Sequence, residues 1–321
     1  MEGTPAPATA SLVCDRDFLP AALSLIEEAE TAVNVAQFSL YPGSSTGALR
    51  DALIDAAERG VTVRVLLDDE VEQNGPAAEA LVAGGVDARL DRVDTTMHAK
   101  VVAADDAAIV GSTNGSDSAI ERNRECNLLL RDGAPPSYVA GWFDRVWADA
   151  TDRTPPGPRG TGDVVALVND DLLAHLLDRV GEARRRVDFT MYATYLQPNN
   201  LDSPAMQVFS AFEEAAARGV VVRGVAEHSR TNEGLNAQTA EAVEWLRARG
   251  VSMRWEDGAT VTHAKVIRAD DGIQVESANF STSGFERNQE VGAWTTQEAP
   301  VAAFEAWFED LWGASTEEPA R

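Results

Sequence analysis

Two histidine–lysine pairs are the residues of this chain whose types and spacing best suit chemistry. His98 and Lys100 are separated by one alanine, and His263 and Lys265 repeat the same three-residue pattern. These are the only two lysines among the 27 basic residues of the 321-residue chain. Since arginine supplies positive charge everywhere else, these two positions require something that its planar fork lacks, which is the compact ammonium group of lysine.

Hydroxyl and amide residues follow each pair and complete a set that suits a phosphodiester. Ser112 and Asn114 follow the first pair, and Ser277 and Asn279 follow the second. Ammonium and amide groups would bind the non-bridging phosphate oxygens. One histidine would attack phosphorus, and the other would protonate the leaving oxygen and then activate water. Since no carboxylate cluster has the spacing of metal ligands, we expect neither a metal nor another cofactor.

The region around the first pair is repeated around the second pair. An offset of 165 residues maps all of these residues in the first half onto their counterparts in the second. Upstream, 57–69 matches 216–228, and 32–41 matches 186–195. Self-similarity of this extent indicates an internal duplication.

Each half has the pattern of an α/β unit. Apolar runs rich in β-branched residues predict strands that are covered on both faces, and amphipathic stretches that end at glycine predict helices. We therefore expect an α/β protein with two homologous α/β/α sandwich lobes, over 1–152 and 163–321, joined by a Pro- and Gly-rich linker over 153–162. The paired aromatic residues near 142 and 307 are expected to pack a closing helix onto each core.

The histidine–lysine segments themselves are predicted to be strands of hairpins. Residues i and i+2 of a strand point to the same face. His98 and Lys100 should therefore point the same way, as should His263 and Lys265. The Ala-Asp-Asp segments that follow predict the turns of the hairpins.

Both halves carry a longer signature that resembles the phospholipase D superfamily. The signature is H-x-K-x4-D followed by G-S-x-N, and this chain has HAKVVAAD with GSTN and HAKVIRAD with ESAN. The resemblance runs from about residue 15 to about residue 315. It implies that the two motifs meet at a pseudo-twofold interface, that they form one active site within a monomer, and that one histidine becomes a covalent phosphohistidine.

The resemblance also assigns roles to four acidic residues. Asp105 and Asp270, the aspartates of the two motifs, are implied to be structural, in agreement with their predicted turn positions. Glu125 and Glu290 match a downstream acid that hydrogen-bonds the histidine, and such a partner fixes the tautomer of the imidazole ring. A solvated surface charge is the alternative for each glutamate, and their repetition at one offset argues against it.

One position departs from the signature. Glu276 replaces the glycine of the second motif, whereas Gly111 keeps the glycine of the first. A side chain and a negative charge there would narrow the phosphate pocket or repel the substrate, unless the side chain points away. We therefore expect His98 to be the nucleophile and His263 to be the acid.

Composition bounds the setting in which the protein works. The net charge of −25, with 52 acidic residues, indicates adaptation to high salt, which screens self-repulsion; a GC-rich genome would explain the arginines but not the acids. Cys14 and Cys126 have no metal-ligand spacing and are expected to be buried free thiols. The N-terminus is unlike a signal peptide and no apolar run has membrane length, so we expect a cytoplasmic protein.

The signature alone does not choose among phosphodiesters. A strongly acidic chain whose largest basic cluster is ARRR (183–186) is a poor nucleic-acid binder, so a phospholipid hydrolase or phosphatidyl transferase is the favoured function. Loops at 41–45 and 195–203 carry Tyr, Pro and Leu residues that would allow peripheral membrane contact. An endonuclease that acts on DNA or RNA by the same mechanism is the alternative, and a non-catalytic binding module is the third hypothesis.

Overall fold

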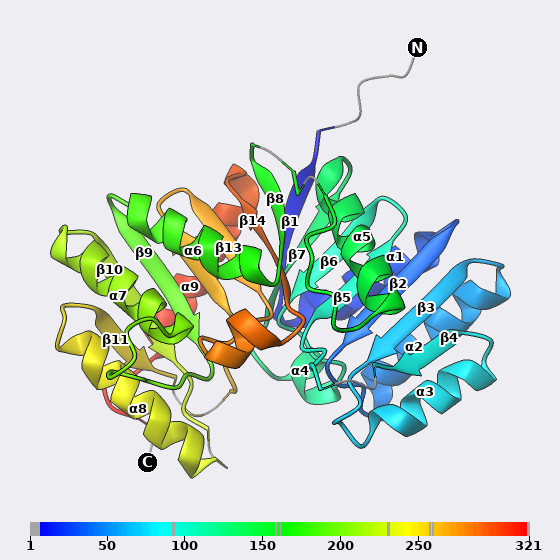
Figure 1. Cartoon of the computed structure of the whole chain (residues 1–321), viewed down its shortest axis with the longest axis horizontal. Coiled ribbons are helices and arrows are strands. Elements are labelled where there is room, and N and C mark those ends of the chain that lie inside the picture. The colour runs from blue at the N-terminus through cyan, green and yellow to red at the C-terminus, as the bar shows by residue number, and fades with distance from the viewer. Residues whose placement is uncertain are drawn as a thin grey trace.

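The computed structural model describes residues 7–91, 94–157, 159–160, 162–229, 232–256, 258 and 260–319. Two parts of the sequence-based interpretation fall partly outside the described residues. These are the first six residues of the N-terminal segment, and Pro158 and Thr161 of the expected linker. The described residues form two lobes that lie side by side (Figure 1).

Each lobe is built on a mixed seven-stranded sheet. The strand order is β1-β7-β6-β5-β2-β3-β4 in the first sheet and β11-β10-β9-β12-β13-β14-β8 in the second, so the two sheets have the same topology. Strands β2, β3 and β4 pair in parallel, as do β9, β10 and β11, whereas the other pairs are antiparallel. The strands are β1 (Thr9–Cys14), β2 (Ala32–Gln37), β3 (Thr62–Leu67), β4 (Asp87–Leu90), β5 (Lys100–Ala104), β6 (Ala107–Gly111), β7 (Cys126–Arg131), β8 (Val164–Val168), β9 (Arg186–Met191), β10 (Val221–Ala226), β11 (Ser252–Trp255), β12 (Val266–Ala269), β13 (Gly272–Glu276) and β14 (Val291–Thr295).

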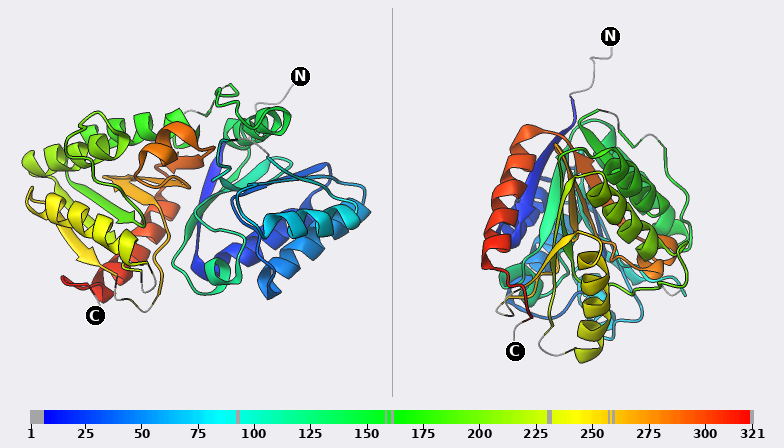
Figure 2. Two further views of the ribbon diagram at one scale, coloured as in Figure 1. Left: turned by 60° about the horizontal axis from the view of Figure 1, so that its bottom comes forward. Right: turned by 90° about the vertical axis from the view of Figure 1, so that its left-hand side faces the viewer.

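Helices cover both faces of the sheets (Figure 2). Every residue of β5, β6, β13 and β14 is buried, as expected for strands between two helical layers. The expected α/β/α sandwich lobes are thus confirmed. No helix within the described ranges is long and apolar enough to cross a membrane. The helices are α1 (Phe18–Glu28), α2 (Ser44–Glu58), α3 (Asn74–Ala83), α4 (Asp117–Glu121), α5 (Ala134–Ala148), α6 (Asp170–Glu182), α7 (Pro204–Ala217), α8 (Glu233–Arg247) and α9 (Glu298–Ala314), with a short 3-10 helix at Asp15–Asp17 and a π-helical turn at Ser283–Arg287.

A single hydrophobic cluster joins the two lobes. It contains buried side chains from the inner strands of both sheets and from the closing helices α5 and α9. Helix α5 reaches β8 of the second sheet, and α9 reaches β1 of the first. Trp142, Phe143 and Phe308 are fully buried within this cluster. The expected packing of the paired aromatic residues onto the core is confirmed, and the same contacts hold one lobe against the other.

The histidine–lysine strands begin later than predicted. Strand β5 starts at Lys100 and β12 starts at Val266, so His98 and His263 both precede regular strand structure. The turns lie where expected, and their aspartates adopt the left-handed conformation, with φ of 44° at Asp105. The histidines therefore sit on short extended segments, whose backbone is free to pair across the lobe boundary.

Cys14 and Cys126 form a disulfide, so the expectation of free thiols is wrong. They are opposite each other in the antiparallel pairing of β1 with β7, and their Cα atoms are 4.2 Å apart. A separation of 112 residues along the chain hides this closeness, because only the strand order brings the N-terminal strand beside β7. The bond fixes β1 beside Cys126, the residue that directly follows Glu125.

Candidate active site

Two short backbone bridges cross the lobe boundary and bring the two motifs together. Met97 pairs in parallel with Gln289, and Arg124 pairs in parallel with Thr262. The backbone N–H of Arg124 donates to the carbonyl of Val261 at 2.8 Å, and a backbone hydrogen bond closes the bridge between Met97 and Gln289 in the same way. Each bridge places the residue before a motif histidine beside the residue before a glutamate of the other lobe.

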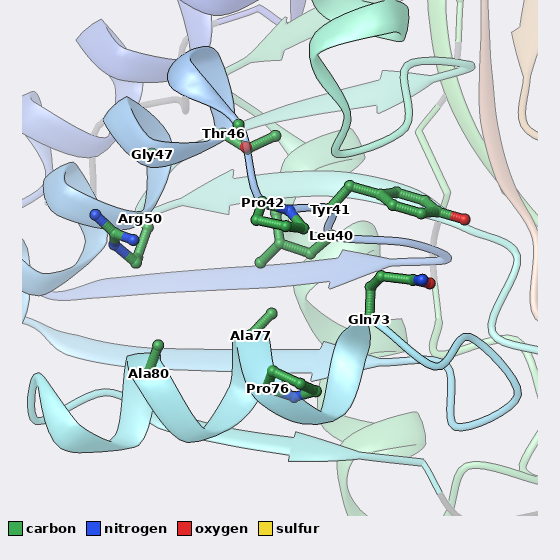
Figure 3. Close-up of a pocket in the computed structure, with 11 residues that line it drawn as sticks. Leu40, Tyr41, Pro42, Thr46, Gly47, Arg50, Gln73, Pro76, Ala77 and Ala80 are labelled. Atoms are coloured by element: carbon green, nitrogen blue, oxygen red, sulfur yellow. The ribbon is translucent and has the colours of Figure 1, made fainter.

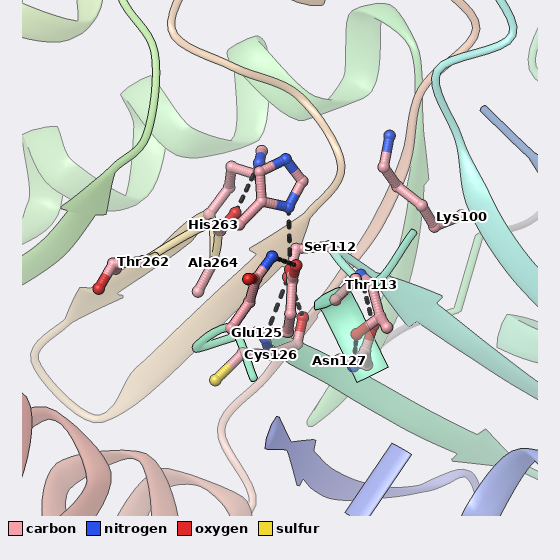
Figure 4. Close-up of polar contacts among 12 residues, drawn as sticks. Lys100, Ser112, Thr113, Glu125, Cys126, Asn127, Thr262, His263 and Ala264 are labelled. Carbon is pink, nitrogen blue, oxygen red and sulfur yellow. Dashed lines mark hydrogen bonds and ion pairs between the residues drawn. The ribbon is translucent and has the colours of Figure 1, made fainter. Parts of the chain in front are cut away.

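Glu125 of the first lobe orients His263 of the second. The Nδ1–H of His263 donates to Oε2 of Glu125 at 3.0 Å (Figure 4). The carboxylate is itself held by the Ser112 hydroxyl at 2.6 Å and by the Asn123 amide at 3.2 Å. The backbone N–H of Glu125 donates to Oδ1 of Asp15 at 2.9 Å. Because the carboxylate accepts at Nδ1–H, Nε2 of the ring keeps its lone pair for chemistry.

Glu290 of the second lobe orients His98 of the first by the same arrangement. The Nδ1–H of His98 donates to Oε1 of Glu290 at 2.8 Å. The Ser277 hydroxyl and the Asn288 amide donate to the same carboxylate. Asn169 takes the place of Asp15 and accepts the Glu290 backbone N–H at 2.9 Å. Each histidine thus depends on a carboxylate from the opposite lobe.

The serines do not face open space in this structure. Ser112 and Ser277 are fully buried, and their hydroxyl groups donate to the two glutamates. The sequence-based expectation was a contact with substrate phosphate. That contact would require these hydrogen bonds to break, so the structure gives the serines the role of holding the carboxylates.

The asparagines of the motifs are better placed for a ligand. Asn114 and Asn279 are half-buried. Within the described part of the chain, Oδ1 of each is buried and has no hydrogen-bond partner. Buried polar atoms are rarely left without partners. An amide oxygen accepts hydrogen bonds, so the group that completes each of these atoms is a donor, whereas phosphate oxygens would bind the Nδ2 groups.

The first histidine–lysine pair lies against one aromatic ring. The ring centroid of Phe38 is 5.0 Å from that of His98, and Nζ of Lys100 is 5.2 Å from it. The Lys100 ammonium also donates to the His98 carbonyl. Both side chains therefore lie on one side, as the i, i+2 spacing predicts, although His98 precedes the strand.

The second pair repeats this contact with Tyr192. The ring of Tyr192 is 4.4 Å from the ring of His263, and its centroid is 4.7 Å from Nζ of Lys265. The lysine donates to the His263 carbonyl at 2.5 Å. Sequence reasoning missed both aromatic residues, although Phe38 aligns with Tyr192 within the matched segments 32–41 and 186–195.

Burial sets the protonation of the four central groups. It lowers the pKa of His98 below its usual value and that of His263 to about 4. It also lowers the pKa of Lys100 to about 8 and of Lys265 to about 7. Each lysine further lowers the pKa of the histidine in the other lobe. The two imidazoles are therefore neutral near pH 7, and the two ammonium groups titrate close to neutrality.

Two buried acids beneath the lysines were also missed. Oδ2 of Asp68 accepts the Met97 N–H at 2.8 Å, and Oε2 of Glu227 accepts the Thr262 N–H at 2.6 Å. Burial raises the pKa of Asp68 to about 6 and of Glu227 to about 7. Each acid holds the backbone just before a motif histidine. Their match within the aligned segments 57–69 and 216–228 was the signal that could have revealed them.

Glu276 does not crowd the site. It is fully buried, its carboxyl accepts the Gln274 amide at 2.6 Å, and burial raises its pKa to about 8. Across the sheet it faces Gly292, whereas Gly111 faces Asn127 in the first lobe. In the first lobe the glycine is on β6 and the larger residue on β7, whereas in the second lobe the larger residue is on β13 and the glycine on β14. The carboxyl is therefore neutral near pH 7 and fills space that a glycine leaves open.

The motif aspartates lie at the far ends of their hairpins. The Asp105 carboxylate accepts the backbone N–H groups of 30–32, and Asp270 accepts those of 184–186. Each aspartate ties the hairpin turn to the segment that enters the neighbouring strand. Within the described residues, no group of three or more His, Cys, Asp or Glu side chains is arranged to hold a metal ion.

The sequence and fold match known proteins. A family model described as "Cardiolipin synthase, PLD-like domain" matches residues 22–147 and 176–312. The crystal structure of phosphatidylserine synthase from Haemophilus influenzae Rd KW20 superposes with a TM-score of 0.76, at 11% identity, over 98% of this chain and 89% of that chain. This likeness shows a shared fold.

Two curated proteins are similar over shorter segments. A phospholipase D from Rickettsia prowazekii (strain Madrid E) is 34% identical over 123 residues, which are 37% of this chain and 58% of that protein. A mitochondrial cardiolipin hydrolase from Mus musculus is 33% identical over 94 residues, which are 29% of this chain and 42% of that protein. The matched segments thus span about half the length of these relatives.

The hydrogen bond between Glu125 and His263 of the other lobe gives a testable prediction, and Glu276 provides its control. Glu125→Gln should lower kcat on a generic phosphodiester such as bis-p-nitrophenyl phosphate by at least about 100-fold, because the amide no longer fixes the His263 tautomer. Glu276→Gln replaces a buried carboxyl that is already neutral, and it should retain activity within about twofold of the wild type. Equal losses in the two variants would contradict the orienting role of Glu125.

The pKa values predict a bell-shaped pH profile on bis-p-nitrophenyl phosphate, whose leaving group departs without a proton from an acid. kcat/KM should rise as pH rises through about 4, because His263 becomes neutral. It should fall above pH 7 to 8, because Lys265 and then Lys100 lose the charge that binds phosphate. Glu276→Gln should keep the alkaline limb. A wild-type profile that stays flat to pH 9, or an alkaline limb that Glu276→Gln removes, would contradict the assignment to the lysines.

Proposed function

This chain belongs to the family of cardiolipin synthase, PLD-like domains, and from that premise we propose that it is a phosphodiesterase of the phospholipase D type that acts on phospholipids. The observation that carries the proposal is the composite site, in which two neutral histidines and two lysines converge from two lobes. One chain contains the whole site, so the proposal needs a single copy.

In the first step, one histidine attacks phosphorus. Nε2 of His263 forms the P–N bond, the P–O bond to the leaving group breaks, and its electron pair stays on the leaving oxygen. That oxygen takes a proton from Nε2 of His98, whose pKa the bound phosphodiester anion raises. The lysines stabilise the charge on the non-bridging oxygens, and Glu125 stabilises the positive phosphoimidazole ring.

In the second step, water releases the phosphoryl group. His98, now neutral, takes a proton from water as the water oxygen bonds to phosphorus and the P–N bond breaks. The lone pair returns to Nε2 of His263. An alcohol in place of water would give transfer rather than hydrolysis, and neither route needs a metal ion.

This order of roles reverses the order expected from sequence. That expectation made His98 the nucleophile because Glu276 was thought to crowd the second motif. Glu276 is instead buried opposite Gly292. With no crowding to disfavour the second motif, we assign the attack to His263, whose pKa burial lowers to about 4 so that the ring is neutral.

Exposed apolar side chains near the site support a phospholipid substrate. Tyr41, Tyr195 and Val261 are 41%, 52% and 40% exposed. Tyr41 lies within four residues of the end of β2, Tyr195 within four residues of the end of β9, and Val261 within four residues of His263. Leu201, in the loop after Tyr195, is 64% exposed. Exposed apolar residues in the segments that adjoin the site can contact a lipid surface, and a net charge of −25 disfavours nucleic acid.

A covalent intermediate gives the decisive test of the proposal. His98→Asn should release about one equivalent of p-nitrophenolate from bis-p-nitrophenyl phosphate in a burst and then stall, because that leaving group needs no acid but the intermediate needs a base. Alkaline quenching and mass spectrometry should find the adduct on His263, and His263→Asn should give no burst. EDTA should leave the wild-type rate unchanged.

Other outcomes separate the alternatives. A burst in His263→Asn with the adduct on His98 would restore the order expected from sequence. No burst in either variant, together with loss of activity in EDTA, would contradict the covalent mechanism. Cleavage of DNA or RNA, with no cleavage of any phospholipid in high salt, would replace the proposed substrate by nucleic acid.

A further inference from the structure

An apolar groove lies between α2 and α3 on the first lobe. We call it the α2–α3 groove; its volume is about 230 Å³. The groove is too small for a whole drug-sized ligand, which typically fills roughly 300–1,000 Å³, so it suits part of a larger molecule. Its walls are mostly apolar and include Leu40, Pro42, Gly47, Pro76, Ala77 and Ala80 (Figure 3).

The mouth of the groove adjoins the catalytic site. Tyr41 and Gln73 lie at one end of the groove and Arg50 at the other (Figure 3). The N–H of Tyr41 donates to the carbonyl of Gly115 at 2.7 Å, and Gly115 directly follows Asn114 of the first motif.

The segment that walls the groove also walls the catalytic pair. The Asn74 side chain accepts the Leu40 N–H at 2.7 Å and donates to the Phe38 carbonyl at 2.9 Å. Phe38 packs on His98, and Leu40 lines the groove. Residues 38–41 therefore lie between the His98 ring and the groove.

The second lobe has filled the same space. Helix α7 is the copy of α2, and at the offset of 159 residues Met206 stands for Gly47 and Phe209 for Arg50. Both side chains are fully buried. The duplication thus supplies its own comparison, in which one copy packs this position with large apolar residues and the other leaves it open.

We propose that the α2–α3 groove binds one acyl chain of the lipid whose phosphodiester reacts at the catalytic site. This inference rests on the proposed function. Gly43 to Arg50 spans about two helical turns, or roughly 10 Å at 1.5 Å per residue, which suits an extended chain. The occupant is uncharged, because the one charged wall residue, Arg50, pairs with Asp51 at 2.7 Å. The chain then fixes which ester oxygen faces the acid.

Filling the groove as the second lobe does tests this proposal. Gly47→Met adds a side chain in a helix at a position where a Cβ meets no atom within 4 Å. Gly181→Met in α6 is the matched control, since its Cβ also meets no atom within 4 Å and it lies outside the groove. Methionine favours helix more than glycine does, so both variants should fold.

The readout is kcat/KM on two substrates at high salt. These are dioleoyl phosphatidylcholine in mixed micelles and the chainless ester bis-p-nitrophenyl phosphate. Gly47→Met should lower kcat/KM on the lipid by at least about tenfold, since each buried methylene contributes roughly fourfold, and leave the chainless ester within about twofold. Gly181→Met should change neither value.

Each other outcome overturns a definite statement. Wild-type cleavage of the lipid with no loss in Gly47→Met would overturn the groove assignment and leave the proposed function intact. An equal loss on both substrates would also overturn it, because the substitution would then act on the chemistry. A wild-type protein that cleaves the chainless ester but no phospholipid would overturn the proposed function and this inference together.

Discussion

The hydrogen bond from each motif histidine to a carboxylate of the opposite lobe is the constraint on which the structure depends. His98 reaches Glu290 at 2.8 Å and His263 reaches Glu125 at 3.0 Å. Hydrogen bonds weaken steeply with distance and angle, so neither ring can be oriented unless the lobes are fixed against each other. The two backbone bridges and the shared aromatic core of α5 and α9 provide that rigidity.

Bringing so many ionisable groups into one buried space is costly, and the site reduces that cost in three ways. The imidazoles are neutral, the lysine pKa values fall toward neutrality, and the carboxylates accept several hydrogen bonds each. Burial alone would raise the pKa of Glu290, but the hydrogen bonds from His98 and Ser277 and the charge of Lys100 together lower it. The buried charges that remain are paired, and a phosphodiester anion would complete the balance.

The sequence predicted the fold because the duplication repeats its elements, and it marked the histidines and lysines that the structure brings together. It could not predict that the glutamates cross between lobes, since Glu125 and Glu290 have identical spacing within their own halves. It also hid the disulfide, because strand order decides that β1 lies beside β7. The offset of 165 residues pairs Gly111 with Glu276 and Asn127 with Gly292. That the two changes compensate each other is visible only in the structure, where Gly111 faces Asn127 and Glu276 faces Gly292 across a sheet.

The pairing of each histidine with the glutamate of the opposite lobe can be measured by NMR, because the chain has only four histidines. Protein labelled with ¹⁵N-histidine should show a downfield Nδ1–H resonance for each of the two histidines that donate to a carboxylate, besides that of His175, whose Nδ1–H donates to the Gln274 amide oxygen. Glu125→Gln should shift the resonance of His263 and spare that of His98, and Glu290→Gln should do the opposite. A pattern in which each glutamine variant shifts the histidine of its own lobe would contradict the account.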